Sequence, residues 1–287
     1  MSCTKERLMN KTVYIDSPNI KYFDFINKNY PWNWGDYNKF VWKHCEDPYK
    51  NEKQFYVIKN ENKICSLGVG NVYPFSYKNE SIKVLMMMDF VTSSEYQKKG
   101  LINQIANYIV KNVDSDVAIG FASKRLYENI YKDKLVLQKY YLHQFNESIS
   151  KIDCGIVDDY TLISKRLNSN TSAFQIKRDE RYLDYINKNP QYEKVIYVTN
   201  DELLVGIGLN HNVARIIELS EYNIESCIQA IQMALNFASE ILVDLPCDTI
   251  LYNSKLLKET YVVLNEINTT IYKEGDESIW IPVIERK

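Results

Sequence analysis

Hydrophobic and polar residues alternate along the first half of the chain in a pattern that predicts three consecutive β-strands. Two strands are expected over residues 54–58 and 63–70, and a third begins at residue 82 and continues through residue 91. Polar turns at 60–62 and 77–80 separate these strands. Because both connections are short, neighbouring strands should pair antiparallel.

A helical pattern follows the third strand. Its apolar positions recur at intervals of three or four residues, at Leu101, Ile102, Ile105, Ala106, Ile109 and Val113. A short apolar strand is then expected over residues 117–121, and a second helical pattern passes through Tyr127 and Tyr131 and ends near Lys134. This order of elements indicates an α/β (α+β) fold in which a mixed, mostly antiparallel sheet is flanked by helices.

The second half of the chain repeats this pattern. Phe40 lies eight residues before Pro48, and Tyr182 lies eight residues before Pro190. Each of these blocks precedes an apolar strand, a polar turn and a strand with two glycines, which reads Leu67-Gly68-Val69-Gly70 in the first half and Val205-Gly206-Ile207-Gly208 in the second. An internal duplication explains this repetition.

The duplication predicts two domains. We expect a first domain over residues 1–150, a linker over 151–172 and a second domain over 173–287. The linker is rich in Ser, Asn and Asp and contains only short apolar pieces. Halves of about 140 residues are each long enough to bury a core.

The composition of the chain argues against several classes of function. The net charge of -2 argues against a general nucleic-acid binder, because such proteins concentrate positive charge. No apolar run is long enough to cross a membrane and the N-terminus lacks a signal-peptide core, so we expect a cytoplasmic protein that does not bind membranes. The six cysteines form no C-x-x-C pair and the three histidines lie far apart in sequence, so we expect reduced thiols and no metal site.

The segment between the third strand and the first long helix has the features of an anion-binding loop. Gln97, Lys98, Lys99 and Gly100 precede the helix that begins at Leu101. Free N–H groups at a helix start point outward, and the helix dipole adds partial positive charge. The two lysines add full charges, and a glycine lets the backbone approach an anion closely. The loop is therefore predicted to bind phosphate groups.

This loop resembles the pyrophosphate loop of the GNAT superfamily of acyl-coenzyme A N-acyltransferases, whose pattern is Gln/Arg-x-x-Gly-x-Gly/Ala. Gln97 and Gly100 match the pattern, and Ile102 occupies its last position. The resemblance extends over residues 20–145, because the order of strands and helices is also that of the family. Together with the duplication, it implies two tandem GNAT-like domains.

A second similarity follows the fifth strand. Tyr131-Lys132-Asp133-Lys134 is similar in register to a family motif whose tyrosine lies near the sulfur of the cofactor, with Leu135 and Val136 in place of the motif's Gly-Phe pair. A phenol can donate a proton to a departing thiolate while staying neutral at pH 7. The resemblance therefore implies Tyr131 as the general acid, and Tyr127, one turn earlier, competes for this role.

The resemblance implies an N-acetyltransferase that moves an acetyl group from acetyl-CoA to a primary amine. The residues expected to bind coenzyme A are Phe90, Val91, Thr92, Gln97, Lys98, Lys99, Gly100, Leu101 and Ile102. Backbone N–H groups near Phe90 would hold the pantetheine arm and polarise the thioester carbonyl. The proton of the amine would leave through Asp89, through Glu95 or through an ordered water.

The second half differs at the loop. Counted along the sequence, Asn223-Ile224-Glu225-Ser226 corresponds to the segment from Gln97 to Gly100. A carboxylate beside a pyrophosphate is repulsive. We therefore expect a degenerate second half that helps to form the acceptor cleft and binds no coenzyme A.

Two other functions fit the same residues. One is a non-catalytic acyl-CoA sensor or interaction module, and the other is an aminoacyl-tRNA-dependent transferase, a class in which two GNAT-like halves are also paired. The retained Gln97, Lys98, Lys99 and Gly100 favour coenzyme A over both. The acceptor, a small-molecule or peptide amine, is not identified by the sequence, and neither are the length of the acyl group and the oligomeric state.

Overall fold

The computed structural model describes residues 12–30, 35–124, 128, 136–146, 149–170, 174–245, 254–267 and 279–280. Its strands are β1 (Val13–Asp16), β2 (Phe55–Asn60), β3 (Lys63–Tyr77), β4 (Glu80–Thr92), β5 (Val117–Ser123), β6 (Val136–Asn146), β7 (Gly155–Val157), β8 (Phe174–Ile176), β9 (Lys194–Thr199), β10 (Leu204–Asn210), β11 (Val213–Leu219), β12 (Glu240–Leu245), β13 (Lys255–Ile267) and β14 (Ile279–Trp280). Its helices are α1 (Ile20–Asn29), α2 (Tyr37–Val41), the π-helix η1 (Trp42–Glu46), the 3-10 helix η2 (Ser94–Tyr96), α3 (Leu101–Asn112), α5 (Tyr160–Leu167), α6 (Glu180–Asn187) and α7 (Ile224–Ala234).

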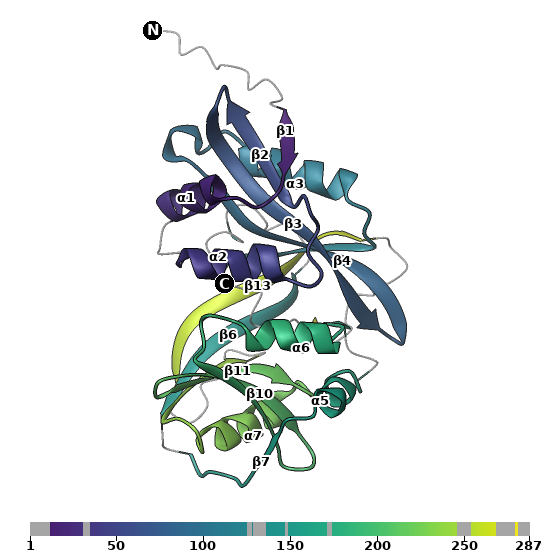
Figure 1. The fold of residues 1–287 in the computed structure, drawn as a ribbon, viewed down its shortest axis with the longest axis vertical. Helices are drawn as coiled ribbons and strands as arrows, with labels where there is room; N and C mark the ends of the chain where they lie inside the picture. The colour runs from purple at the N-terminus through teal and green to yellow at the C-terminus, as the bar shows by residue number, and fades with distance from the viewer. Residues whose placement is uncertain are drawn as a thin grey trace.

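The first half has the predicted mixed α/β arrangement. β2 pairs antiparallel with β3 and β3 with β4, whereas β4 and β5 are parallel and α3 connects them. α3 covers one face of these strands, and α1 and α2 lie on the other face (Figure 1). The strands predicted from the sequence are confirmed, although β3 and β4 extend further towards their shared turn than the pattern indicated.

The second half repeats this topology. β9, β10 and β11 pair antiparallel in sequence order, and β11 is parallel to β12 across the connecting helix α7. In each repeated strand, a neighbouring side chain lies so close to the first glycine that a Cβ atom would not fit there. A Cβ atom on Gly68 would lie 2.5 Å from the Phe90 ring, and one on Gly206 would lie 2.8 Å from Glu218.

One strand ties the two halves into a single sheet, an arrangement that the sequence pattern did not predict. β13 follows β12 along the chain, yet it lies between β5 and β6 and pairs antiparallel with both. β6 in turn pairs with β12 of the second half. The strands of both halves therefore form one continuous sheet, with β13 and β6 crossing the middle of the molecule (Figure 1).

The segment 151–172, predicted as a linker, contains folded elements. Its short apolar pieces form β7, which pairs with β9, and α5, whose Ile163 and Leu167 are fully buried. Burial of these two side chains stabilises the helix against the second half. The limits of the two domains remain a prediction.

Helices from the two halves pack directly against each other. The indole Nε1 of Trp42 donates a hydrogen bond to the carbonyl of Tyr185 at 2.9 Å, and the two rings stack with centroids 4.6 Å apart. Tyr49 donates to the carbonyl of Lys177 at 3.1 Å. These contacts extend one hydrophobic core across both halves.

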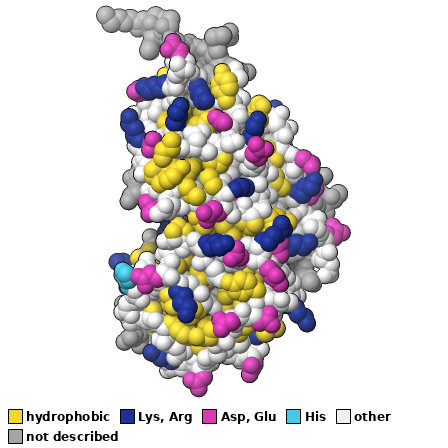
Figure 2. All heavy atoms as spheres, in the orientation of Figure 1, with side chains coloured by type: hydrophobic (Ala, Val, Ile, Leu, Met, Phe, Trp, Pro, Cys, Tyr) yellow, Lys and Arg dark blue, Asp and Glu magenta, His cyan; other side chains and the backbone are white. Residues whose placement is uncertain are grey.

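The surface is ordinary for a charge-balanced protein. Figure 2 shows acidic and basic side chains interspersed over the visible face. Within the described residues, the helices are all too short or too polar to cross a lipid bilayer.

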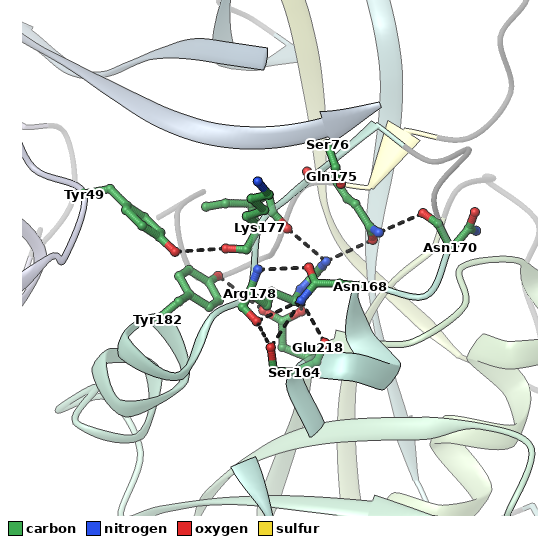
Figure 3. A network of polar contacts seen from close by, with 11 residues as sticks. Tyr49, Ser76, Ser164, Asn168, Asn170, Gln175, Lys177, Arg178, Tyr182 and Glu218 are labelled. Atoms are coloured by element: carbon green, nitrogen blue, oxygen red, sulfur yellow. Dashed lines mark hydrogen bonds and ion pairs between the residues drawn. The ribbon is translucent and has the colours of Figure 1, made fainter. Parts of the chain in front are cut away.

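A buried ion pair joins Arg178, which precedes α6, to Glu218 of β11 (Figure 3). Arg178 and Glu218 are both completely buried, and Arg178 Nε donates to Glu218 Oε2 at 2.5 Å. Arg178 also donates to Gln175 Oε1 at 3.0 Å, and Tyr182 donates to Glu218 Oε1 at 3.2 Å. Removing one partner of such a pair would leave an uncompensated charge in the interior, which is far more costly than replacing both.

We expect the Glu218→Gln variant to lose about 3–5 kcal/mol of unfolding free energy, because it leaves the Arg178 charge buried without a counter-ion. Replacing both residues, as Arg178→Met with Glu218→Leu, should recover most of this loss. Urea denaturation followed by fluorescence measures both changes. A single variant as stable as the wild type would contradict the assignment of a tight buried pair.

The start of α3 requires a glycine. Gly100 is the N-cap residue with a φ of 73°, in the left-handed region, and a Cβ atom there would meet nothing within 4 Å. Gly100→Ala should therefore cost only the backbone strain, about 1–2 kcal/mol. Gly155 is equally open but has no positive φ, so Gly155→Ala is the matched control and should be neutral or slightly stabilising. Equal melting temperatures for the two variants would contradict this conformation of the loop.

Candidate active site

Strands β4 and β5 separate at one end. Their last parallel pair joins Met87 and Gly120, beyond which β4 continues to Thr92 and β5 to Ser123. In these end segments β4 still pairs with β3, and β5 still pairs with β13. The facing edges of the two strands therefore have no ladder partner in the described part of the chain, which leaves backbone groups for an extended ligand.

The loop after β4 leads to an exposed helix start. Gln97, Lys98, Lys99 and Gly100 are all exposed, and Lys98 also has a positive φ, of 62°. The first bond of α3 runs from the N–H of Gln104 to the carbonyl of Gly100, so the N–H groups of residues 101–103 have no acceptor among the described residues. Together these groups fit a phosphate-bearing ligand.

Gln97 connects this loop to the end of β4. Its Nε2 donates to the carbonyl of Thr92 at 3.5 Å. Ser66, on the neighbouring β3, donates to the carbonyl of Val91 at 3.1 Å, and its hydroxyl lies 2.8 Å from that of Thr92. The predicted cofactor-binding residues of β4 and of the loop are therefore held together at one end of the sheet.

A β-bulge in β4 places Asp89 away from these groups. The β3–β4 register shifts between Leu67 and Val69, which leaves Asp89 and Phe90 opposite the single residue Gly68. The Phe90 ring packs against the cluster that contains Leu101 and Ile105 of α3. Asp89 instead contacts the π-helix that continues α2.

Asp89 belongs to a buried polar cluster. Its Oδ2 lies 2.9 Å from Lys43 Nζ and 3.2 Å from His44 Nε2, and all three residues are at most 6% exposed. Burial by itself raises the pKa of Asp89, but the Lys43 ammonium and the hydrogen bond with His44 outweigh it and hold that pKa well below the usual range. Burial lowers the pKa of His44, so its imidazole is neutral at pH 7.

Lys39 adds a second cation on the same helix. It is half-buried, and burial together with the nearby Lys43 lowers its pKa to about 8. Lys258, on the inserted strand β13, also lowers the pKa of Lys39, whereas Asp89 raises it. Charged groups from the two halves of the chain therefore influence one another near the separated strands.

Glu95, the other candidate acid, lies on the surface. Its carboxylate accepts a hydrogen bond from Lys63 at 2.5 Å, and its side chain is 62% exposed. This bond lowers the pKa of Glu95. Because the pKa values of Asp89 and Glu95 are both lowered, neither carboxylate is tuned to accept a proton near pH 7.

Tyr131 and Tyr127 lie outside the described residues, so their roles stay predictions. Lys43 and His44 were not predicted as site residues, because Asp89 is distant from them in the chain. The local signal is weak, since the two residues simply follow the apolar run Phe40-Val41-Trp42.

In the second half the corresponding strands also separate, but other groups fill the space. The last parallel pair of β11 and β12 joins Arg215 and Leu242. Beyond it, Arg215 forms an ion pair with Asp244 at 2.9 Å, and the hydroxyl of Tyr222 donates to the carbonyl of Asp244 at 2.9 Å. The Tyr222 bond therefore occupies a backbone carbonyl of β12 beyond its last pair with β11.

The second loop is also shorter than the sequence alignment suggested. Four residues separate Tyr96 from the start of α3, whereas Asn223 alone separates Tyr222 from α7. Asn223, and not Ser226, therefore corresponds to Gly100, because both are N-cap residues. The Asn223 side chain accepts a hydrogen bond from the N–H of Ser226 at 2.9 Å, which uses a donor that a phosphate would need.

Comparison with known proteins shows what this geometry resembles. No protein-family model and no curated protein sequence matches the chain. Among solved structures, a GCN5-related N-acetyltransferase from Kribbella flavida superposes with a TM-score of 0.61 at 8% identity, over 88% of this chain and 71% of that one. A GCN5-related N-acetyltransferase from Anabaena variabilis gives a TM-score of 0.59 at 10% identity, over 88% and 72% of the two chains.

A protein from Pyrococcus horikoshii extends the likeness over nearly all of both chains. It superposes with a TM-score of 0.63 at 9% identity, over 94% of this chain and 95% of that one. Superpositions at such low identity show the fold alone. The chain has the fold of the GNAT superfamily.

Proposed function

We propose that this protein is an N-acyltransferase that moves an acyl group, most simply acetyl, from acetyl-CoA to a primary amine. The observation that carries the proposal is the separation of β4 from β5 beside an exposed helix start with two lysines. Phe90, Val91 and Thr92 would hold the pantetheine arm, and residues 97–102 would hold the pyrophosphate. Acetyl-CoA supplies an activated thioester.

The protein's own groups account for the remaining chemistry. A bond forms between the amine nitrogen and the thioester carbon, the carbon–sulfur bond breaks, the amine loses a proton and the sulfur gains one. A backbone N–H of β4 at the separated edge would stabilise negative charge on the thioester oxygen. Holding both reactants at one end of the sheet supplies much of the rate. The lowered pKa values of Asp89 and Glu95 make both carboxylates weak bases for the amine proton, which an ordered water would relay to bulk solvent.

In this proposal the second half binds no coenzyme A. Tyr222 occupies a backbone carbonyl of β12, and Asn223 caps α7. The second half supports β5 from the outer side through β13, and its expected part in forming the acceptor cleft stays in the proposal. The acceptor amine and the cytoplasmic location remain part of the proposal.

Charge reversal tests the loop. Changing both Lys98 and Lys99 to glutamate should weaken coenzyme A binding roughly 10- to 100-fold, because exposed ion pairs contribute up to about 1 kcal/mol each and reversal adds repulsion. Changing both to glutamine should cost less. Isothermal titration calorimetry measures the affinity, and the wild type should bind one molecule of coenzyme A per chain.

A double variant of Lys151 and Lys194 to glutamate is the matched control, because it changes the net charge equally at exposed positions outside the loop. It should bind coenzyme A like the wild type. Unchanged affinity in the Lys98 and Lys99 glutamate variant, or two equivalent sites in the titration, would contradict the proposed loop.

Tyr131 provides a separate test of the chemistry. Removing its hydroxyl, as Tyr131→Phe, should keep the fold and the affinity for coenzyme A but lower kcat about 10²-fold, as expected for a lost general acid. Tyr127→Phe is the control for the neighbouring phenol. Thiol release with a panel of amines gives the rates. If Tyr131→Phe turns over like the wild type where chemistry limits the rate, Tyr131 is not the acid.

A further inference from the structure

Asp89 has an uncommon backbone conformation. Its φ is 50°, in the left-handed region, although it lies inside a strand. Of the non-glycine residues that share a positive φ in the described part of the chain, the others lie in turns and loops, at Glu61, Lys78, Asn79, Lys98, Asp201 and His211. A conformation of this kind persists only where surrounding contacts enforce it.

The contacts that enforce it come from an uncommon helix. Lys43 and His44 are adjacent residues of η1, yet both reach the same oxygen of Asp89. Neighbours on a regular α-helix point about 100° apart, whereas the wider π turn brings them closer in direction. π-helical turns occur frequently at functional sites.

His44, one of the two residues that contact Asp89, is itself held in place. The His44 ring packs between Phe40 and Phe55, with centroids 5.0 Å away in each case. Gln54 donates to the backbone carbonyl of His44 at 2.7 Å. Asp89 is therefore anchored to a rigid part of the core.

The second half forms the same bulge without any of these features. Its β10–β11 register shifts beside Gly206, so that Ile217 is the extra residue where the first half has Asp89. Ile217 is buried and has no positive φ, and α6 is a regular helix with Tyr185 and Ile186 at the positions counted for Lys43 and His44. The buried ion pair beside this bulge, Arg178 with Glu218, involves the residue after Ile217 and not the extra residue itself. A bulge at this place in the fold therefore needs neither a charged extra residue nor the π-helix.

We propose that Lys43, His44 and Asp89 form an anchor that sets the direction of β4 beyond the bulge, and that Asp89 is a positioning residue for acyl transfer and not its general base. This proposal rests on the proposed function. The anchored carboxylate fixes the peptide groups of residues 90–92 at the open edge, where the thioester would lie. A backbone donor displaced from that position stabilises the developing charge poorly.

Three substitutions of Asp89 separate the possible roles. Asparagine tolerates the left-handed conformation and keeps an oxygen for Lys43 and His44, glycine tolerates the conformation without an anchor, and alanine provides neither. Because asparagine leaves the Lys43 charge unbalanced, the double variant Lys43→Met with Asp89→Asn, which keeps the His44 contact of the anchor, replaces it if the single variant does not fold. Ile217→Val, in the other bulge, is the control and should behave like the wild type.

The kinetic readout uses acetyl-CoA with glucosamine, spermidine and lysine as amines. For an anchor, Asp89→Asn or its double variant should keep kcat within about threefold of the wild type, while Asp89→Gly and Asp89→Ala should lose about 10²-fold, as for a misplaced oxyanion donor. The KM for acetyl-CoA should change little, since the loop holds the pyrophosphate. An asparagine variant as slow as alanine would show that the carboxylate itself is the base. An unchanged kcat in Asp89→Gly and Asp89→Ala would show that the cluster of Lys43, His44 and Asp89 contributes only to packing.

A second readout does not depend on activity. Amide hydrogen exchange of residues 88–92, measured in the ligand-free protein, should be faster in Asp89→Gly and Asp89→Ala and unchanged in the asparagine variant. Equal exchange in all variants would overturn the anchor, whatever the enzyme assay shows. If the wild type neither binds nor turns over acetyl-CoA, the proposed function fails, and the exchange result still decides whether the anchor exists.

Discussion

Main-chain pairing of β13 with both β5 and β6 is the interaction on which the rest of this molecule depends. A strand that lost this partner would carry unpaired N–H and C=O groups into the middle of the protein, which is costly. β13 holds β5 along its length, from Val117 to Ser123. β5 can therefore diverge from β4 on its inner side without losing its place in the sheet. The open edge of the candidate site is a consequence of support supplied by the second half.

The two halves share one topology but differ at the place where their parallel strands separate. In the first half, the separated edges of β4 and β5 stay open, the helix start is uncapped by any side chain, and charged residues are buried beside the bulge. In the second half, Arg215 pairs with Asp244, Tyr222 bonds to a backbone carbonyl of β12, and Asn223 caps the helix. The bonds of Tyr222 and Asn223 each satisfy a backbone group, at the end of β12 and at the start of α7. The helix start of the first half has no such side-chain cap.

Buried charge also distinguishes the halves. The second half encloses Arg178 and Glu218 in a network of neutral partners, with Glu218 opposite Gly206 in the second bulge. The first half places Lys43 and Asp89 next to the strand that has to bend. A fully surrounded pair contributes to specifying one packed arrangement, whereas a pair beside an open edge can also hold a backbone segment ready for a ligand.

The sequence by itself determined the local elements and the likeness between the halves. Strands β2 to β5, helix α3 and their repeats follow from alternation and helical periodicity, because each pattern defines which face of an element is buried. The loop from Gln97 to Gly100 was also recognisable, since its chemistry is contained in four consecutive residues. Only the tertiary structure decided the insertion of β13, the meeting of Asp89 with Lys43 and His44, and the correspondence of Asn223 with Gly100. Each of these joins residues distant in the chain, and such pairings depend on which surfaces fit together after the elements have formed, information that no local pattern carries.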